Sequence, residues 1–219
     1  MLPYQAQFIQ FALETGVLKF GEFTLKSGRV SPYFFNTGLF NSGETMLKFS
    51  RFFAKSIENS DIEFDVLFGP AYKGITLACA AAMALSESTG KEVPFAFNRK
   101  EAKDHGEGGN TVGAPIKGDI AIIDDVITAG TAIKESIAMI KDYNAKPKAV
   151  FLALDRQEKG QADGVTTPYS AIQQIEQEYE VPIIAIATLQ NLIDYLKEQP
   201  ERENYLDRMR HYRDEFGID

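Results

Sequence analysis

The chain has 219 residues, of which 44% are hydrophobic and 25% are charged, a composition typical of one globular domain. Its formal net charge of −8 disfavours a general nucleic-acid or membrane-surface binder, because such proteins need a basic surface. The single cysteine, Cys79, excludes a disulfide framework and a cysteine-based metal site. No apolar run approaches the ~20 residues that span a bilayer, and the N-terminus lacks a signal-peptide pattern, so a cytoplasmic protein is expected.

Apolar spacing along the chain predicts an alternation of helices and strands. The first half should contain a helix over residues 4–15, short strands within 20–38, a helix over 43–59, a strand over 64–68, a helix over 75–88 and a strand over 93–98. The second half should contain a strand over 120–123, a helix from 131, a strand over 148–154, a helix beginning near Thr166-Thr167-Pro168, a strand over 182–189 and a C-terminal helix. We therefore predict one α/β domain spanning residues 1–219. Its parallel sheet has about five strands flanked by helices, and residues 1–40 form a small N-terminal hood.

The most informative stretch begins as a buried strand, turns acidic and ends in a loop of small residues. Asp124 and Asp125 follow the apolar run at 120–123, and the loop TAGT then opens a helix. A helix start offers unpaired N–H groups to a phosphate, Gly130 allows close approach, and the carboxylates can accept hydrogen bonds from sugar hydroxyls. An isolated Asp-Asp pair could equally cap a turn, with Thr131 capping the helix. The small-residue loop favours a site for a phosphorylated sugar.

A second loop between strand and helix reads GPAYKGIT over residues 69–76. It begins like a nucleotide-binding P-loop, but Ile75 stands where that loop requires its lysine. The sequence therefore does not predict an NTPase.

The most polar segment, residues 99–117, contains closely spaced glycines and has no apolar period. This pattern predicts a long mobile loop over 98–118, and long loops in compact domains are usually functional or disordered. Because its charges nearly cancel, a solvated disordered loop is the plain alternative.

Three further positions are ambiguous when they are considered alone. Lys26 reads as a solvated strand residue, and Phe34-Phe35 as a core or interface pair. Arg156 follows a predicted strand, where open parallel sheets bind ligands, and its planar guanidinium suits a carboxylate. By position alone, structural and functional roles for Arg156 are equally supported.

The stretch IAIIDDVITAGTAI resembles the phosphoribosyl diphosphate (PRPP) motif of the type I phosphoribosyltransferases. Within that family, LKSGRVSPYFFNTG and the spacing RKxxKxH resemble the orotate phosphoribosyltransferases. The resemblance implies the type I fold and the conversion of orotate and PRPP to orotidine 5′-monophosphate and diphosphate, a step of de novo pyrimidine biosynthesis. It also implies Mg²⁺ as cofactor, a cis peptide bond at Ala71-Tyr72, and a homodimer in which the loop residues Arg99, Lys100, Lys103 and His105 serve the neighbouring subunit's site.

The resemblance also implies a set of site residues. The catalytic residues are Lys103, His105 and Lys26. The residues that bind PRPP are Lys26, Tyr72, Lys73, Arg99, Lys100, Lys103, His105, Asp124, Asp125, Val126, Ile127, Thr128, Ala129, Gly130, Thr131 and Ala132. The residues that bind orotate are Lys26, Phe34, Phe35, Thr128 and Arg156. No residue is expected to bind the metal directly; PRPP would hold Mg²⁺, with Asp124 or Asp125 assisting through water.

Two other functions are compatible with parts of this pattern. A purine phosphoribosyltransferase would share residues 119–132 but not Lys26 with Phe34-Phe35. A regulatory protein of the same fold that senses PRPP and binds nucleic acid is disfavoured by the net charge and by the intact RKxxKxH spacing.

Overall fold

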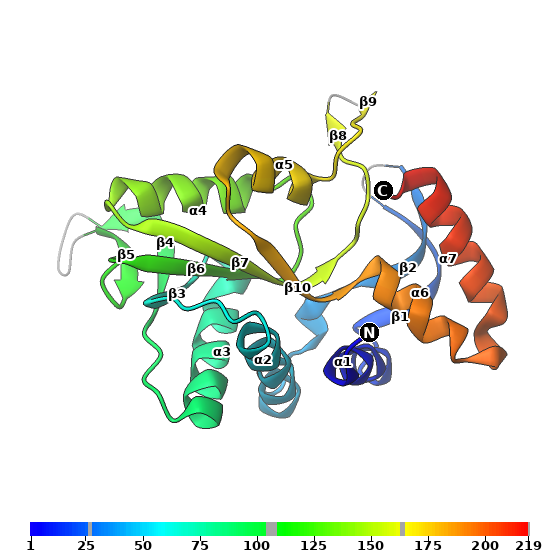
Figure 1. Ribbon diagram of the computed structural model, residues 1–219, viewed down its shortest axis with the longest axis horizontal. Helices are drawn as coiled ribbons and strands as arrows, with labels where there is room; N and C mark the ends of the chain where they lie inside the picture. Colours follow the sequence, from blue (N-terminus) through cyan, green and yellow to red (C-terminus); the bar gives the residue numbers. More distant parts are fainter. Residues whose placement is uncertain (26–27, 104–108, 163–164, 219) are drawn as a thin grey trace.

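The computed structural model describes residues 1–25, 28–103, 109–162 and 165–218. Figure 1 shows a central sheet with helices on both faces and, beside it, a smaller lobe near which both chain ends lie. None of the helices in these ranges is both long and apolar enough to cross a bilayer.

The central sheet has six strands in the order β10-β7-β6-β3-β4-β5. Their bounds are Ile183–Thr188, Lys146–Asp155, Asp119–Asp124, Val66–Gly69, Phe95–Lys103 and Gly109–Gly113. The first five strands run parallel, and β5 is an antiparallel edge strand. Residues 120–123 of β6 are buried, as a strand covered by helices on both faces requires. The predicted parallel α/β sheet is confirmed.

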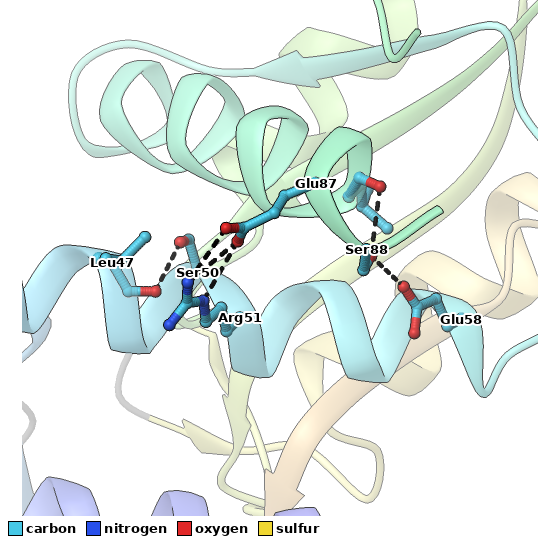
Figure 2. A network of polar contacts seen from close by, with 7 residues as sticks. Leu47, Ser50, Arg51, Glu58, Glu87 and Ser88 are labelled. Atoms are coloured by element: carbon cyan, nitrogen blue, oxygen red, sulfur yellow. Dashed lines mark hydrogen bonds and ion pairs between the residues drawn. The ribbon is translucent and has the colours of Figure 1, made fainter. Parts of the chain in front are cut away.

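Helices α2 (Gly43–Glu58) and α3 (Lys73–Thr89) cover one face of the sheet, while α4 (Thr131–Asp142) and α5 (Ala171–Tyr179) cover the other (Figure 1). On the outer surface, Arg51 of α2 pairs with Glu87 of α3 at 3.1 Å, and Ser88 donates a hydrogen bond to Glu58 (Figure 2). The Arg51–Glu87 pair is exposed and contributes little, so the buried faces of these helices carry most of the stability.

The N-terminal hood consists of α1 (Pro3–Glu14), the antiparallel strands β1 (Leu18–Thr24) and β2 (Val30–Phe35), and the short 3-10 helix η1 (Thr37–Leu39). Phe8 of α1 stacks on Phe49 of α2 with ring centroids 6.0 Å apart, which joins the hood to the main core. Thr37 donates a hydrogen bond to Asp125, which follows β6, and Tyr33 donates one to Glu158, which follows β7. The hood therefore lies over the carboxyl ends of the parallel strands.

The C-terminal segment packs beside the hood as α6 (Leu189–Lys197), the 3-10 helix η2 (Pro200–Arg202) and α7 (Glu203–Phe216). Leu206, Met209 and Tyr212 are buried on the inner face of α7. The predicted C-terminal helix is confirmed, but α6 was missed because it begins directly where β10 ends.

The prediction of an irregular loop over residues 99–117 is wrong for most of that segment. Strand β4 continues to Lys103, and β5 (Gly109–Gly113) pairs back against it. The hairpin lies at the sheet edge, where backbone pairing can hold a polar sequence without an apolar pattern. Residues 104–108, including His105, lie outside the described residues, and the predicted mobility stays a prediction.

The predicted start of the helix after β7 is also wrong. Thr166 belongs to β9 (Val165–Thr166), which pairs with β8 (Gln161–Ala162). Helix α5 begins at Ala171, and Ser170 is its N-cap, with its hydroxyl accepting from Gln173 N at 3.0 Å. Both Thr166 and Ser170 have side chains that favour an N-cap, so local sequence could not separate them.

Candidate active site

The junction between β6 and α4 has the form of an anion site. Gly130 is the N-cap of α4 with φ +77°, and within the described residues the helix has no side-chain cap. Thr131 therefore does not cap it, and the alternative interpretation of this loop is wrong on that point. The positive φ favours glycine, and a Cβ on Gly130 would lie 2.8 Å from Ile175 Cδ1, so the end of that side chain would have to shift. The uncapped N–H groups and the helix dipole favour a phosphate here.

The other residues predicted in this loop contribute in two different ways. Val126 and Ile127 are partly buried and pack against the two hydrophobic clusters on opposite sides of the sheet. Thr128, Ala129, Thr131 and Ala132 are exposed at the start of α4. The structure brings these predicted residues together in one loop.

The carboxylate of Asp125 joins three separate elements. It is 6% exposed, and its Oδ2 accepts from Thr37 Oγ1 and from Lys73 Nζ, each at 2.6 Å. Lys73 is the first residue of α3, and its side chain is 55% exposed. Lys73 therefore presents its charge at the surface of the site while Asp125 holds it. Thr37 was not predicted, and no local signal could have found it because it is 88 residues away in sequence.

Asp124 has a different environment. Its Oδ1 accepts from the N–H of Asp125 at 2.8 Å. The pKa of Asp124 is raised to about 7, mainly by burial and secondly by the adjacent negative charge of Asp125. Asp124 is therefore the carboxylate of the pair whose charge changes near neutral pH.

The junction between β3 and α3 is built by close contact of two glycines. A Cβ on Gly69 would lie 1.9 Å from Gly74 O, which leaves no space for any side chain. The predicted cis peptide bond at Ala71-Tyr72 is confirmed. The N–H of Ala71 donates to Asn98 Oδ1 of β4 at 2.7 Å, which ties the loop to the neighbouring strand.

This second junction is also an uncapped helix start. Tyr72 is the N-cap of α3, and no side-chain cap occurs in the part of the chain that the structure describes. Its ring is 70% exposed, and Lys100 Nζ of β4 lies 4.9 Å from the ring centroid. Lys73 and Lys100 thus add positive charge beside a second helix start that lacks a side-chain cap, although Ile75 N donates to Tyr72 O at 3.3 Å, and this arrangement suits a polyanion.

Arg156 follows β7 and is held by partners of this chain. Its Nε donates to Glu158 Oε1 at 2.9 Å, and its guanidinium lies 4.9 Å from the centroid of the Tyr33 ring. Tyr33 Oη donates to the same Glu158 oxygen at 3.2 Å. The sequence did not predict roles for Glu158 and Tyr33. Two opposite charges two residues apart in a loop are too common to indicate a site, and Tyr33 lies 125 residues from Glu158 in sequence.

The two predicted phenylalanines of the hood point in opposite directions. Phe35 packs on Phe8 in the core, with centroids 6.3 Å apart, whereas Phe34 is 37% exposed and lies 5.4 Å from Phe23. Adjacent strand residues face opposite sides, so the two rings cannot line one pocket with their side chains. Lys26 and His105 lie outside the described residues. Lys103 is the last residue of β4, but its side chain is not among the described parts of the structure.

A cavity of about 1020 Å³ lies at the opposite, amino-terminal edge of the sheet, lined in part by Asp65, Asp119 and Lys148. Its lining also includes Glu58, Asp61, Glu63 and Glu92. A phosphorylated ligand would be repelled by so many carboxylates, so the two helix starts define the site better than cavity size does. Among the described residues, no group of three or more His, Cys, Asp or Glu side chains could hold a metal ion.

Two uncapped helix starts, flanked by lysines and an acidic pair, are the features of a phosphoribosyl-transfer site. The phosphoribosyl transferase domain family matches residues 39–182, and the chain belongs to that family. The sequence is 56% identical over 218 residues to the orotate phosphoribosyltransferase of Pectobacterium carotovorum, and 56% identical over 219 residues to that of Chromobacterium violaceum. Each comparison covers 100% of both chains.

The fold is also similar to that of a solved relative. The crystal structure of orotate phosphoribosyltransferase from Francisella tularensis superposes with a TM-score of 0.87 at 44% identity, covering 96% of this chain and 99% of that one. The predicted family and fold are therefore confirmed.

Proposed function

We propose that this chain transfers the phosphoribosyl group of PRPP to orotate, giving orotidine 5′-monophosphate and diphosphate in de novo pyrimidine biosynthesis. Full-length relatives that carry the name orotate phosphoribosyltransferase support this activity. The observation that carries it is the pair of uncapped helix starts, at Gly130 and Tyr72, separated by Asp124 and Asp125. One helix start suits the 5-phosphate of PRPP, the other suits its diphosphate, and the acidic residues suit the ribose between them.

In this mechanism, the N–H groups of residues 128–132 hold the 5-phosphate, and Asp124 accepts from a ribose hydroxyl. A bond forms between a ring nitrogen of orotate and C1 of the ribose while the bond from C1 to the diphosphate oxygen breaks, and that nitrogen releases its proton to the solvent. Negative charge then grows on the leaving diphosphate. Lys73, Lys100 and Arg99 neutralise it, and Lys103 or His105 donates a proton. Closure of the hairpin over the site would exclude water, which competes as a nucleophile.

Orotate differs from uracil by a carboxylate, and Arg156 is the group proposed to bind it. The guanidinium lies beside the hood at the carboxyl edge of the sheet, where ligands of parallel sheets bind. Lys26 and the backbone of Phe34 and Phe35 complete the proposed orotate site together with Thr128.

The family resemblance implies Mg²⁺, and this chain's residues fit it only as a partner of PRPP. Asp125 Oδ2 already accepts from Thr37 and Lys73, so Asp124 is the carboxylate that would assist through water. When bound, the ion would neutralise charge on the diphosphate. We further propose a single domain over residues 1–219, a cytoplasmic location, and a homodimer in which Arg99, Lys100, Lys103 and His105 serve the partner subunit's site.

The test is to mix the protein with Mg²⁺, PRPP and orotate and to follow the loss of orotate absorbance with and without a chelator. Metal-dependent loss, absent when hypoxanthine or uracil replaces orotate, is the expected result. Turnover with a purine alone would reassign the base, and no turnover with any base would favour the PRPP-sensing regulator.

A further inference from the structure

Glu158 is the centre of a mostly buried polar cluster behind Arg156. Its Oε1 accepts from Arg156 Nε at 2.9 Å and lies 2.8 Å from Arg156 Nη2. The same oxygen accepts from Tyr33 Oη at 3.2 Å. The side chains of Arg156 and Glu158 are 20% and 13% exposed, so water screens this ion pair less than a surface pair.

Tyr33 fixes the cluster from the hood side. Its ring is fully buried and lies under the guanidinium, 4.9 Å from ring centroid to Cζ. Burial raises the pKa of Tyr33 well above its ordinary value, so its hydroxyl remains a donor to Glu158 at neutral pH. The ring also meets Tyr212 of α7 edge to face, with centroids 6.4 Å apart.

The backbone that carries Glu158 is fixed by the end of the chain. Glu158 forms an antiparallel bridge with Gly217, Lys159 N donates to Phe216 O at 2.8 Å, and Ile218 N donates to Gln157 O at 3.0 Å. The carboxylate therefore approaches Arg156 from a loop that α7 holds in place.

These contacts occupy the edge of the guanidinium that carries Nε and Nη2, and they do not involve Nη1. Nε donates to Glu158, and Nη2 forms an ion pair with it, while within the described residues Nη1 makes no hydrogen bond; the Tyr212 hydroxyl also lies beside Arg156 and Glu158. An arginine side chain has many rotamers, and a ligand that binds a mobile one must order it. In this cluster the ordering is complete before a ligand arrives.

Resting on the proposed function, in which Arg156 binds the orotate carboxylate, we propose that Glu158 is a positioning residue for substrate recognition. It holds the guanidinium over the Tyr33 ring so that Nη1 meets the carboxylate. Its negative charge also opposes the carboxylate of orotate. Positioning outweighs this repulsion, because without Glu158 the guanidinium would lose its only described carboxylate partner and turn away from the site.

Steady-state kinetics on the full chain test this role. Glu158→Ala should raise the KM for orotate about tenfold, the effect of losing one charge-assisted hydrogen bond, and should leave the KM for PRPP unchanged. Glu158→Gln keeps an acceptor oxygen and should stay within about threefold of the wild-type KM for orotate. A merely structural role would not separate the two KM values. An unchanged or lowered KM for orotate in Glu158→Ala, or an equal rise for PRPP, would overturn the proposal.

Two further variants keep the test decisive if Glu158→Ala does not fold. Tyr33→Phe keeps the ring under Arg156 but removes one donor to Glu158, and it should raise the KM for orotate about twofold to threefold. Arg156→Ala distinguishes a failure of the proposed function from a failure of the positioning role of Glu158. If the wild-type protein does not use orotate, both the proposed function and this inference fail. If Arg156→Ala raises the KM for orotate while Tyr33→Phe leaves it at the wild-type value, only the positioning role fails.

Discussion

Helices α3, α4, α5 and α6 begin in two different ways. Helices α5 and α6 are closed by their own side chains: Ser170 accepts from Gln173 N, and Thr188 accepts from Asn191 N at 3.2 Å. Helices α3 and α4 begin at Tyr72 and Gly130, and neither has a side-chain cap within the described ranges. Compared with a capping Ser or Thr, an N-cap residue without a capping oxygen such as Tyr72 costs about 1 kcal/mol, and a glycine such as Gly130 costs only a few tenths of a kcal/mol, so neither start gains stability from its N-cap side chain.

The difference indicates which helix starts serve the fold and which serve a ligand. At the open starts, the chain places glycines, lysines and an acidic pair instead of a capping hydroxyl. A bound phosphate would supply the missing acceptors for the N–H groups. The comparison therefore gives the junctions at Gly69–Lys73 and Asp124–Thr131 binding roles and leaves proton transfer to residues outside them.

The largest expected effect separates chemistry from binding. Lys103 lies outside both junctions, so Lys103→Ala should lower kcat by about 100-fold or more, the usual contribution of a general acid, while PRPP affinity changes far less. Single-turnover rates and titration with PRPP measure the two quantities. Equal losses in both would mean that Lys103 serves binding and not proton donation.

The next effect concerns the packing of the β3–α3 junction. Gly69→Ala would force a Cβ to within 1.9 Å of Gly74 O, so we expect a loss of about 3 kcal/mol or more in the free energy of unfolding. Urea denaturation measures it. Gly43→Ala is the matched control, because no atom lies within 4 Å of its new Cβ. Similar stability of the two variants would contradict the close backbone contact.

The acidic pair gives the β6–α4 junction a pH dependence. The pKa of Asp124 is raised to about 7, so between pH 4 and 7 the folded state binds more protons than the unfolded state. The contribution of protonated Asp124 to the free energy of unfolding is complete near pH 4, and it is lost as the pH rises through about 7. Relative to Asp124→Asn, the wild-type protein should lose roughly 2 kcal/mol or more over this window. Parallel curves of unfolding free energy against pH for the two proteins would be the contrary result.

A smaller effect isolates the phosphate role of Gly130. Gly130 and Gly90 both have positive φ, at +77° and +68°, so the backbone angle should cost about 1 kcal/mol of stability for alanine at either position, and Gly130→Ala should cost more because its Cβ would also lie 2.8 Å from Ile175 Cδ1. Gly90 follows α3 at its far end, away from the site. Only Gly130→Ala should weaken PRPP binding, by about tenfold, as calorimetric titration would measure. The interpretation fails if both variants bind PRPP equally well.

Local sequence was sufficient for the five parallel strands of the sheet and for the loop between β6 and α4 that we propose binds PRPP. The apolar run before Asp124 and the helical spacing after Thr131 both follow from burial, and burial is periodic in sequence. Strand β5 was missed because an exposed edge strand needs no apolar pattern. The early start predicted for α5 failed because Thr166 and Ser170 are chemically similar candidates for a cap.

The contacts that organise the site could not be predicted in the same way. Thr37 meets Asp125 from 88 residues away, and Tyr33 meets Glu158 from 125 residues away. Such pairs depend on where the hood lies on the sheet, and no spacing in the sequence records this. The family resemblance named Arg156 and Asp125 but not the partners that hold them.

We propose that the open starts of α3 and α4 bind phosphate and that the capped start of α6 does not. Backbone amide NMR during titration with PRPP tests it most directly. The account predicts large shifts for the amides of residues 129–132 and 72–74, at the starts of α4 and α3. It predicts none for residues 189–191, at the start of α6 that Thr188 caps. Shifts of equal size at all three helix starts, or no shift at residues 129–132, would contradict it.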